Sequence, residues 1–129
     1  MAEYKLTTEI VPIVNGLLAS IDVPKYPHTR KPVKVPDEYI VINSLPINAE
    51  TMQFCYVNVN YYCKDIDGGK GVGNVPDSIK LNAGAKLVLA ALKKVTSGNY
   101  LIDFEKSEVI PEGTEHYVNL QFSFKYINS

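Results

Sequence analysis

Two long stretches of this chain alternate between apolar and polar side chains with a period of two. In residues 53–64, cysteine, valine and tyrosine side chains occupy one set of alternate positions, and tyrosines and asparagines occupy the other. Residues 116–127 repeat the pattern with larger apolar side chains. Because successive side chains of a strand point to opposite faces, this period predicts two half-buried strands in one sheet.

Shorter segments predict the rest of the sheet. Residues 38–45 are rich in β-branched side chains and lie between Pro36 and Pro46, which favours a third strand. Residues 100–104 and 109–110 predict one further strand or a broken hairpin. The sheet is therefore expected to have four to five strands.

Two amphipathic helices are available to cover the apolar face of this sheet. Apolar side chains recur at three- and four-residue steps in residues 10–21 and 81–95. Gly84 lies on the apolar face of the second helix, which predicts that a neighbouring backbone approaches it closely. The expected caps and ends are Thr7 or Thr8 for the first helix, and Asp77 or Ser78, Thr96 and Gly98 for the second.

These elements predict an α+β fold with a mostly antiparallel sheet and both helices packed on one face. A length of 129 residues with 46% apolar side chains suits one domain spanning residues 1–129.

Composition excludes several function classes. Thirteen Lys and Arg against fourteen Asp and Glu leave a net charge of -1, which argues against a nucleic-acid binder that relies on a positive field. The longest apolar run, residues 87–92, is too short to cross a membrane. Glu3, Lys5 and Glu9 interrupt the N-terminal segment where a secretion signal would be apolar. We therefore expect a soluble, intracellular protein without a membrane span or sequence-specific nucleic-acid binding.

The two cysteines favour neither a disulfide nor a metal site. In one strand, Cys55 and Cys63 would lie ~26 Å apart, beyond the reach of a disulfide. Neither has a histidine or second cysteine at ligand spacing, so both are expected to be buried apolar residues.

The sequence also lacks a recognisable catalytic motif. The histidines are His28 and His116, and no serine lies in a nucleophile-elbow motif. Asp65 and Asp67 lack the further oxygen ligands of a calcium loop. We expect no catalytic residue, no metal, no cofactor and no enzymatic activity, and an enzyme that uses His116 is kept as a third alternative.

A glycine-rich segment at residues 65–76 separates the second predicted strand from the second helix. It matches neither phosphate-binding glycine motif, so a mobile loop is expected, one that could become ordered on a partner. The residues of this mobile loop are Gly68, Gly69, Lys70, Gly71 and Gly73.

Two segments carry charge of opposite sign. The proline-rich segment at residues 25–36 is basic, and residues 103–115 are acidic apart from Lys106. They form an internal contact, a solvated surface, or a head-to-tail contact between copies in a ring. The candidate interface residues are Lys25, Arg30, Lys31 and Lys34 on one side and Asp103, Glu105, Glu108, Glu112 and Glu115 on the other.

The polar face of the two long strands has no charge. Residues 53–63 and 116–124 contain no Lys, Arg, Asp or Glu, although a solvated sheet face normally carries some. Tyrosine and asparagine suit a protein interface or a sugar-binding face, and the alternative is that the chain itself covers them. The candidate partner-binding residues are Tyr56, Asn58, Asn60, Tyr62, Tyr117 and Asn119.

The order of these elements resembles that of the tail terminator, or tail-completion, proteins of long-tailed bacteriophages and prophages. The segments that carry the likeness are TTEIVPIVNGLLASI, the basic proline-rich crossover, EYIVINSL, QFCYVNVNYYCK, a loop and helix, and YVNLQFSFKYI. This resemblance implies a non-enzymatic α+β subunit that forms a ring, usually sixfold, which caps the tail tube and joins it to the head connector. It further implies self-association, tube and connector proteins as partners, and a location in the virion or in the host cytoplasm during assembly. The alternative function is a monomeric module that binds carbohydrate or peptide through the Tyr/Asn face.

Overall fold

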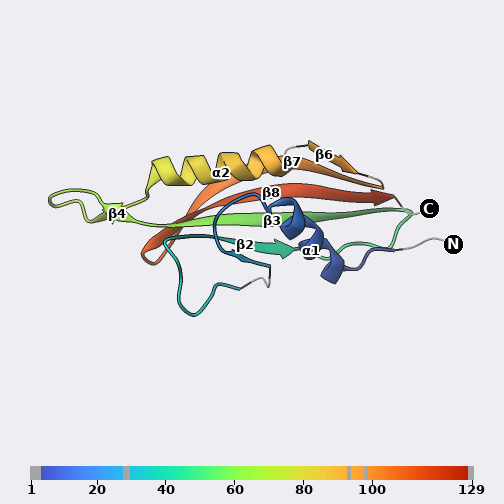
Figure 1. Cartoon of the computed structure of the whole chain (residues 1–129), viewed down its shortest axis with the longest axis horizontal. Coiled ribbons are helices and arrows are strands. Elements are labelled where there is room, and N and C mark those ends of the chain that lie inside the picture. The colour runs from blue at the N-terminus through green and yellow to red at the C-terminus, as the bar shows by residue number, and fades with distance from the viewer. Residues whose placement is uncertain (1–3, 28–29, 93, 98, 128–129) are drawn as a thin grey trace.

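The computed structural model describes residues 4–27, 30–92, 94–97 and 99–127, with two helices and eight strands among them. Figure 1 shows an elongated molecule with both termini near one end. The elements are α1 (Thr7–Leu17), β1 (Lys25–Tyr26), β2 (Glu38–Ser44), β3 (Met52–Lys64), β4 (Ile66–Asp67), β5 (Asn74–Val75), α2 (Ser78–Leu92), β6 (Lys94–Ser97), β7 (Tyr100–Glu112) and β8 (Glu115–Ile127).

The main sheet has six strands in the order β1-β2-β3-β8-β7-β6. The predicted α+β class is confirmed, but the expected strand number was too low. The sheet is also mixed, because β1 pairs with β2 in parallel while the other neighbours are antiparallel. The two additional strands are the short edges β1 and β6, whose few residues have no pattern long enough to predict them.

The helix ends differ from the predictions in three places. The apolar stripe predicted the first helix as far as residue 21, whereas α1 ends at Leu17. Leu6 precedes α1, and its N–H donates to the Glu9 carboxylate at 2.7 Å, so neither Thr7 nor Thr8 is the cap. Asp77 caps α2 as predicted, by accepting from Lys80 N–H at 3.2 Å. The helix ends at Leu92 instead of continuing to Thr96, because residues 94–97 pair with β7. Gly98 lies outside the described residues.

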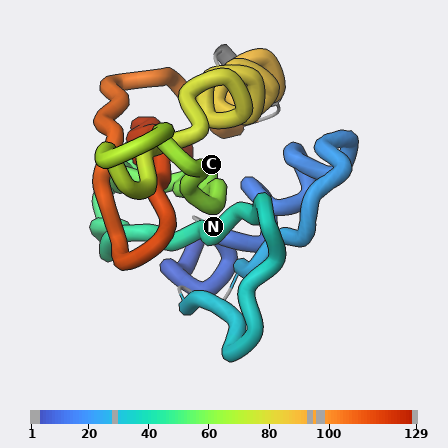
Figure 2. The backbone as a smooth tube through the Cα atoms, turned by 90° about the vertical axis from the view of Figure 1, so that its left-hand side faces the viewer, coloured from blue at the N-terminus to red at the C-terminus, as the bar shows by residue number. Residues whose placement is uncertain are grey.

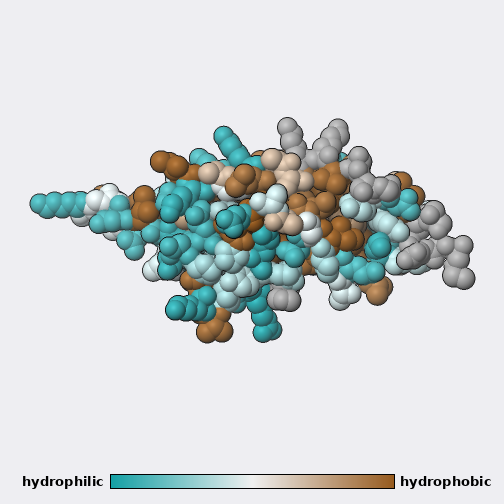
Figure 3. Space-filling model, in the orientation of Figure 1, coloured by the Kyte–Doolittle hydropathy of each residue, from teal (hydrophilic) through white to brown (hydrophobic). Residues whose placement is uncertain are grey.

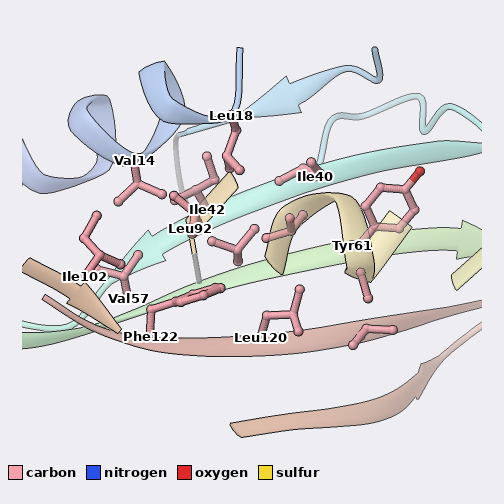
Figure 4. Packing of buried hydrophobic residues seen from close by; sticks show 14 of the residues in the cluster. Val14, Leu18, Ile40, Ile42, Val57, Tyr61, Leu92, Ile102, Leu120 and Phe122 are labelled. Atoms are coloured by element: carbon pink, nitrogen blue, oxygen red, sulfur yellow. The ribbon is translucent and has the colours of Figure 1, made fainter. Parts of the chain in front are cut away.

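Both helices pack on the same face of the sheet (Figures 1, 4). Ile10 and Val14 of α1 and Val88 and Leu92 of α2 are essentially inaccessible to solvent. The strands contribute the alternate positions predicted to be apolar, and these include Cys55, Val57, Val59, Tyr61, Cys63, Leu120, Phe122 and Phe124. Each buried apolar side chain of this size stabilises the fold by about 1.5–3 kcal/mol.

Gly84 of α2 marks the closest approach between helix and sheet. A Cβ added there would overlap the ring of Tyr61. The predicted close neighbour therefore exists, but it is an aromatic side chain and not a backbone.

Residues 100–112 form one strand, β7, so the alternative of a broken hairpin is wrong. Its register against β8 shifts between Phe104 and Lys106, which leaves Glu105 in a bulge. The bulge explains the interrupted apolar pattern, since it exchanges the faces on which later residues of β7 lie.

Candidate functional site

The face of the sheet opposite the helices carries a ladder of tyrosines. Tyr39 of β2, Tyr62 of β3 and Tyr117 of β8 are cross-strand neighbours. Their rings stack with centroids 4.6 Å and 4.5 Å apart, and Tyr26 of β1 meets Tyr39 edge-on at 5.9 Å. The period-two alternation of each strand, together with the register, brings these rings together.

A ladder of asparagines adjoins the tyrosines on the same face. Asn119 donates to Asn58 at 3.2 Å and to Asn60 at 2.7 Å, and Asn58 donates to Asn43 at 3.1 Å. These bonds orient the amides across three strands. The charge-free strip predicted from sequence is therefore one continuous polar network.

The chain itself covers part of this face. Val35, in the loop between β1 and β2, packs on the tyrosine end, and Figures 1 and 2 show this loop bulging from the sheet. Tyr62 is 5% exposed and Asn60 is 8% exposed, so the chain itself covers these two candidate partner-binding residues. Tyr56 is 37% exposed, and Asn58, Tyr117 and Asn119 are partly exposed. The accessible part of the face is thus its asparagine side.

Two ion pairs of Lys31 link the loop between β1 and β2 to the acidic segment. Its Nζ lies 2.6 Å from Glu112 and 2.9 Å from Glu115, and 5.5 Å from the centroid of the Tyr62 ring. Hydrogen bonds to Glu112 and then Glu115 raise the pKa of Lys31. Burial, and then the nearby Glu115 carboxylate, raises the pKa of Tyr39. The alternative of an internal contact therefore holds for Lys31, Glu112 and Glu115.

The other candidate basic residues have different surroundings. Lys25 Nζ donates to the carbonyls of Ile21 and Val23, at 2.6 Å and 3.2 Å, after the end of α1. Arg30 and Lys34 are exposed, and neither has an ion pair among the described residues. They leave unneutralised positive charge on the loop.

The remaining acidic candidates lie along β7. Glu105 and Glu108 are exposed and Asp103 is partly buried, and none of the three has an ion pair within the described part of the chain. The loop itself reaches the end of β7 through the ion pair of Lys31 with Glu112. Arg30 and Lys34 on the loop, and Glu105 and Glu108 on β7, are therefore exposed charges of opposite sign that stay unpaired within the described part of one copy.

The glycine-rich segment forms a small hairpin, which the sequence did not predict. β4 and β5 pair as a separate two-stranded sheet that projects from the end of the molecule (Figure 1). Gly69, Gly71 and Gly73 have φ values of 101°, 78° and 82°, a region that favours glycine. Gly68 N–H donates to Gly73 C=O at 2.7 Å, and Lys70 is exposed. Figure 3 shows a hydrophilic surface at the narrow end of the molecule. The mobility expected for the glycine-rich segment stays a prediction.

The described histidine, His116, and the two cysteines have separate surroundings in the fold. His116 Nδ1 lies 2.6 Å from Asp65 Oδ1, which links β8 to the base of the hairpin, while His28 lies outside the described residues. Cys55 and Cys63 are buried free thiols, as expected. Among the residues that the structure describes, no three His, Cys, Asp or Glu side chains could hold a metal ion. Within the same residues, neither helix is long and apolar enough to cross a membrane.

Sequence reasoning missed a pocket of about 500 Å³ between α1 and the edge of β2. The described residues that line it are uncharged, and they include Thr7, Thr8, Val11, Asn15, Gly16 and Ser44. The sequence feature that could have indicated this pocket is the uncharged side of the first helix, which lies outside the apolar stripe.

No protein-family model and no curated protein sequence matches this chain. The resemblance to tail terminator proteins therefore stays a prediction, and the function has to be argued from the surfaces described above.

Proposed function

We propose that this chain is a non-enzymatic structural subunit that assembles head-to-tail into a ring, of six copies as the resemblance implies, which caps a phage-type tail tube and joins it to the head connector. It acts in the virion or in the host cytoplasm during assembly. The observation that carries the proposal is a set of exposed charges of both signs that have no ion pair among the described residues. Arg30 and Lys34 lie in the loop between β1 and β2, and Glu105 and Glu108 lie on β7.

Two different, complementary surfaces on one subunit produce a heterologous contact. Such a contact repeats around a closed ring when the rotation between copies closes. Opposite charges set the orientation of the copies and raise the rate of encounter. The open asparagine side of the sheet, which carries Tyr56, then remains available for tube or connector proteins.

Charge reversal tests the subunit contact. Arg30→Glu/Lys34→Glu places acidic residues against Glu105 and Glu108 of the next copy, so assembly should fall at least tenfold in sedimentation velocity. Glu105→Lys/Glu108→Lys should do the same. An equal mixture of the two variants should restore assembly, because each contact in an alternating ring again joins opposite charges.

Lys70→Glu/Lys86→Glu is the matched control, since it makes the same charge change on the hairpin and on α2. It should assemble like the unaltered chain. A mixture that stays unassembled, or an unaltered chain that stays monomeric at high concentration, would overturn the proposed ring.

The second candidate is a monomeric module that binds carbohydrate or peptide. The exposed Tyr56, beside the partly exposed amides of Asn58 and Asn119, favours it, because aromatic rings and amides together suit sugar recognition. Binding to a glycan array by a monomer, lost in Tyr56→Ala, would support this function over the ring.

A further inference from the structure

The second helix, α2, has apolar side chains on both of its sides. Leu81, Val88 and Leu92 are buried on the side that faces the sheet. Ile79 and Leu87 lie on the outward side, where they are 84% and 53% exposed. A helix that is apolar all round is normally buried. The outward side of α2 therefore has the composition of a surface that another molecule covers.

The position of α2 makes this side accessible. Figures 1 and 2 show α2 outside the sheet, and no described element lies farther out on that side. Figure 3 shows hydrophobic surface, interrupted by hydrophilic side chains, along the edge of the molecule where α2 lies.

The outward apolar side chains of α2 form one ridge. Ile79, Ala83 and Leu87 follow one another at steps of four residues, and all three are exposed. Rows with this spacing are the ridges by which helices pack against one another. Because the small Ala83 lies between two larger side chains, there is room for a side chain of a helix that packs across the ridge.

A lysine lies on each side of this ridge. A helix turns by about 100° per residue, so the order around the outward side of α2 is Lys86, Ile79, Ala83, Leu87 and Lys80. Both lysines are exposed, and neither has an ion pair among the described residues. The ridge is thus flanked by positive charge on both sides.

No acidic residue of α2 balances these lysines. Ser78–Leu92 contains neither Asp nor Glu. Asp77 precedes the helix, and its carboxylate accepts from the backbone N–H of Lys80 as the cap. A partner that neutralises the Lys80 and Lys86 side chains therefore has to bring acidic residues of its own.

The pattern of the ridge and its flanks specifies the chemistry of this partner. When two helices pack together, charges on the flanks of the apolar seam set the choice of partner. Lysines on both flanks favour a helix whose apolar stripe is flanked by Asp or Glu. A second copy of α2 is a poor match, because its flanks carry the same positive charge.

A lipid surface fits α2 less well than an acidic helix does. Helices that lie in a lipid interface direct their large apolar side chains outward and carry many basic residues. In α2 the sheet takes up Leu81, Val88 and Leu92, and Lys80 and Lys86 are the only charged residues of the helix.

We propose that the outward face of α2, formed by Ile79, Ala83 and Leu87 between Lys80 and Lys86, is a docking site for an acidic amphipathic helix of a different protein. This inference goes beyond the proposed ring and does not depend on it. Since α2 and the asparagine ladder lie on opposite faces of the sheet, the two are separate binding surfaces.

A synthetic peptide tests the chemistry of this site. The probe is a fluorescent peptide of about 20 residues, long enough to form a helix, with leucine and alanine on one stripe and glutamate on both flanks. In fluorescence anisotropy it should bind the full chain at least tenfold more tightly than the same peptide with lysine in place of glutamate. Equal binding of the two peptides, or no binding of the acidic one, would overturn the proposal.

Glutamine substitutions test the ridge. Ile79→Gln/Leu87→Gln should lower the affinity for the acidic peptide at least tenfold, with an unchanged circular dichroism spectrum, because both side chains are largely exposed. The matched control is Val72→Gln/Val109→Gln, which alters valines that are 62% and 53% exposed on the hairpin and on β7. It should bind like the unaltered chain. An equal loss in both variants would mean that the peptide does not select α2.

Charge reversal tests the flanks. Lys80→Glu/Lys86→Glu should invert the preference, so that the basic peptide binds more tightly than the acidic one. Lys70→Glu/Lys106→Glu, which alters exposed lysines of the hairpin and of β7, should keep the preference for the acidic peptide. A preference that stays unchanged in Lys80→Glu/Lys86→Glu would contradict the proposed site.

Two measurements identify a different occupant. If the unaltered chain sediments with phosphatidylserine vesicles and Ile79→Gln/Leu87→Gln does not, the face binds lipid and the proposal is wrong. If Ile79→Gln/Leu87→Gln lowers self-association in sedimentation velocity, the face is a contact between copies and the proposal is equally wrong. The ring is tested without peptide by Arg30→Glu/Lys34→Glu, so failure of the ring and failure of the docking site are distinguishable.

Discussion

Lys31 shows how one residue determines which part of the surface stays accessible. Its ammonium group neutralises the Glu115 carboxylate, which is 4% exposed, and its loop covers the tyrosine ladder. A buried carboxylate without a partner is costly, because the charge has lost its hydration. The pair therefore holds the loop against the sheet.

Removing the Lys31 ammonium group should destabilise the subunit. Lys31→Met keeps the aliphatic stem over Tyr62 but leaves Glu115 unpaired, which should lower the free energy of unfolding by about 1–3 kcal/mol in urea titrations. Lys31→Met/Glu115→Gln should recover part of this loss, because the buried group is then neutral. Lys34→Met, which removes an exposed lysine from the same loop, is the control. An equal loss in Lys34→Met would contradict the role of the pair.

The two helical glycines should respond to alanine with opposite signs. Gly84→Ala forces a methyl group into the Tyr61 ring and should cost about 1–3 kcal/mol, despite the better helix propensity of alanine. Gly16→Ala meets open space and should stabilise by about 0.5–1 kcal/mol. Thermal and urea unfolding of both variants measure the difference. A stabilised Gly84→Ala would show that the helix moves away from the sheet at little cost.

The residue pattern predicted which side chains share a face of the sheet better than it predicted which charged residues form ion pairs. The absence of charge on the long strands correctly marked the asparagine ladder as one polar strip, because strand alternation fixes which side chains share a face. The opposite charges of the two segments made Lys31, Glu112 and Glu115 candidates for one contact, but they left open whether that contact lies within one copy or between copies. The residues lie 81 and 84 positions apart, and sequence spacing does not show which long-range charges meet.

Among the elements, strand length decided what could be predicted. The long strands β3 and β8 contain enough alternation to identify them, whereas the two residues of β1 and the four of β6 do not. Residues 94–97 also continue the apolar period of α2, so the local sequence favours helix. Pairing with β7 overrides that preference, which is a tertiary effect.

The tyrosine and thiol groups of β3 should make the sheet sensitive to alkali. Burial, followed by the charge of Glu112, raises the pKa of Tyr62 from 10.0 to about 12. Burial likewise raises the pKa of Cys63 from 9.0 to about 11. The unfolded chain therefore loses these protons at lower pH than the folded chain does.

The stability that Tyr62 and Cys63 contribute should be fully present well below pH 9 and should fall as the pH rises through 9–12, because the unfolded state then binds fewer protons than the folded state. Urea titrations across this range measure the slope. Tyr62→Phe should flatten it, and Tyr56→Phe, whose side chain is 37% exposed in the unaltered chain, is the matched control. An unchanged slope in Tyr62→Phe would contradict this account.

At the scale of the whole molecule, the proposed contact between subunits is electrostatic. Arg30, Lys34, Glu105 and Glu108 are exposed, so dissolved salt screens the contact between them. The Debye length falls from about 8 Å at 0.15 M to about 3 Å at 1 M ionic strength.

Salt should therefore remove the difference between the unaltered chain and the charge-reversed variant. In 1 M sodium chloride the association constants of the unaltered chain and of Arg30→Glu/Lys34→Glu should converge, because both the attraction and the introduced repulsion are screened. Sedimentation velocity from 0.05 to 1 M sodium chloride measures both association constants, and Lys70→Glu/Lys86→Glu is the control that should follow the unaltered chain at every salt concentration. If the deficit of Arg30→Glu/Lys34→Glu were the same at 0.05 and 1 M sodium chloride, these charges would not act through an electrostatic contact between copies.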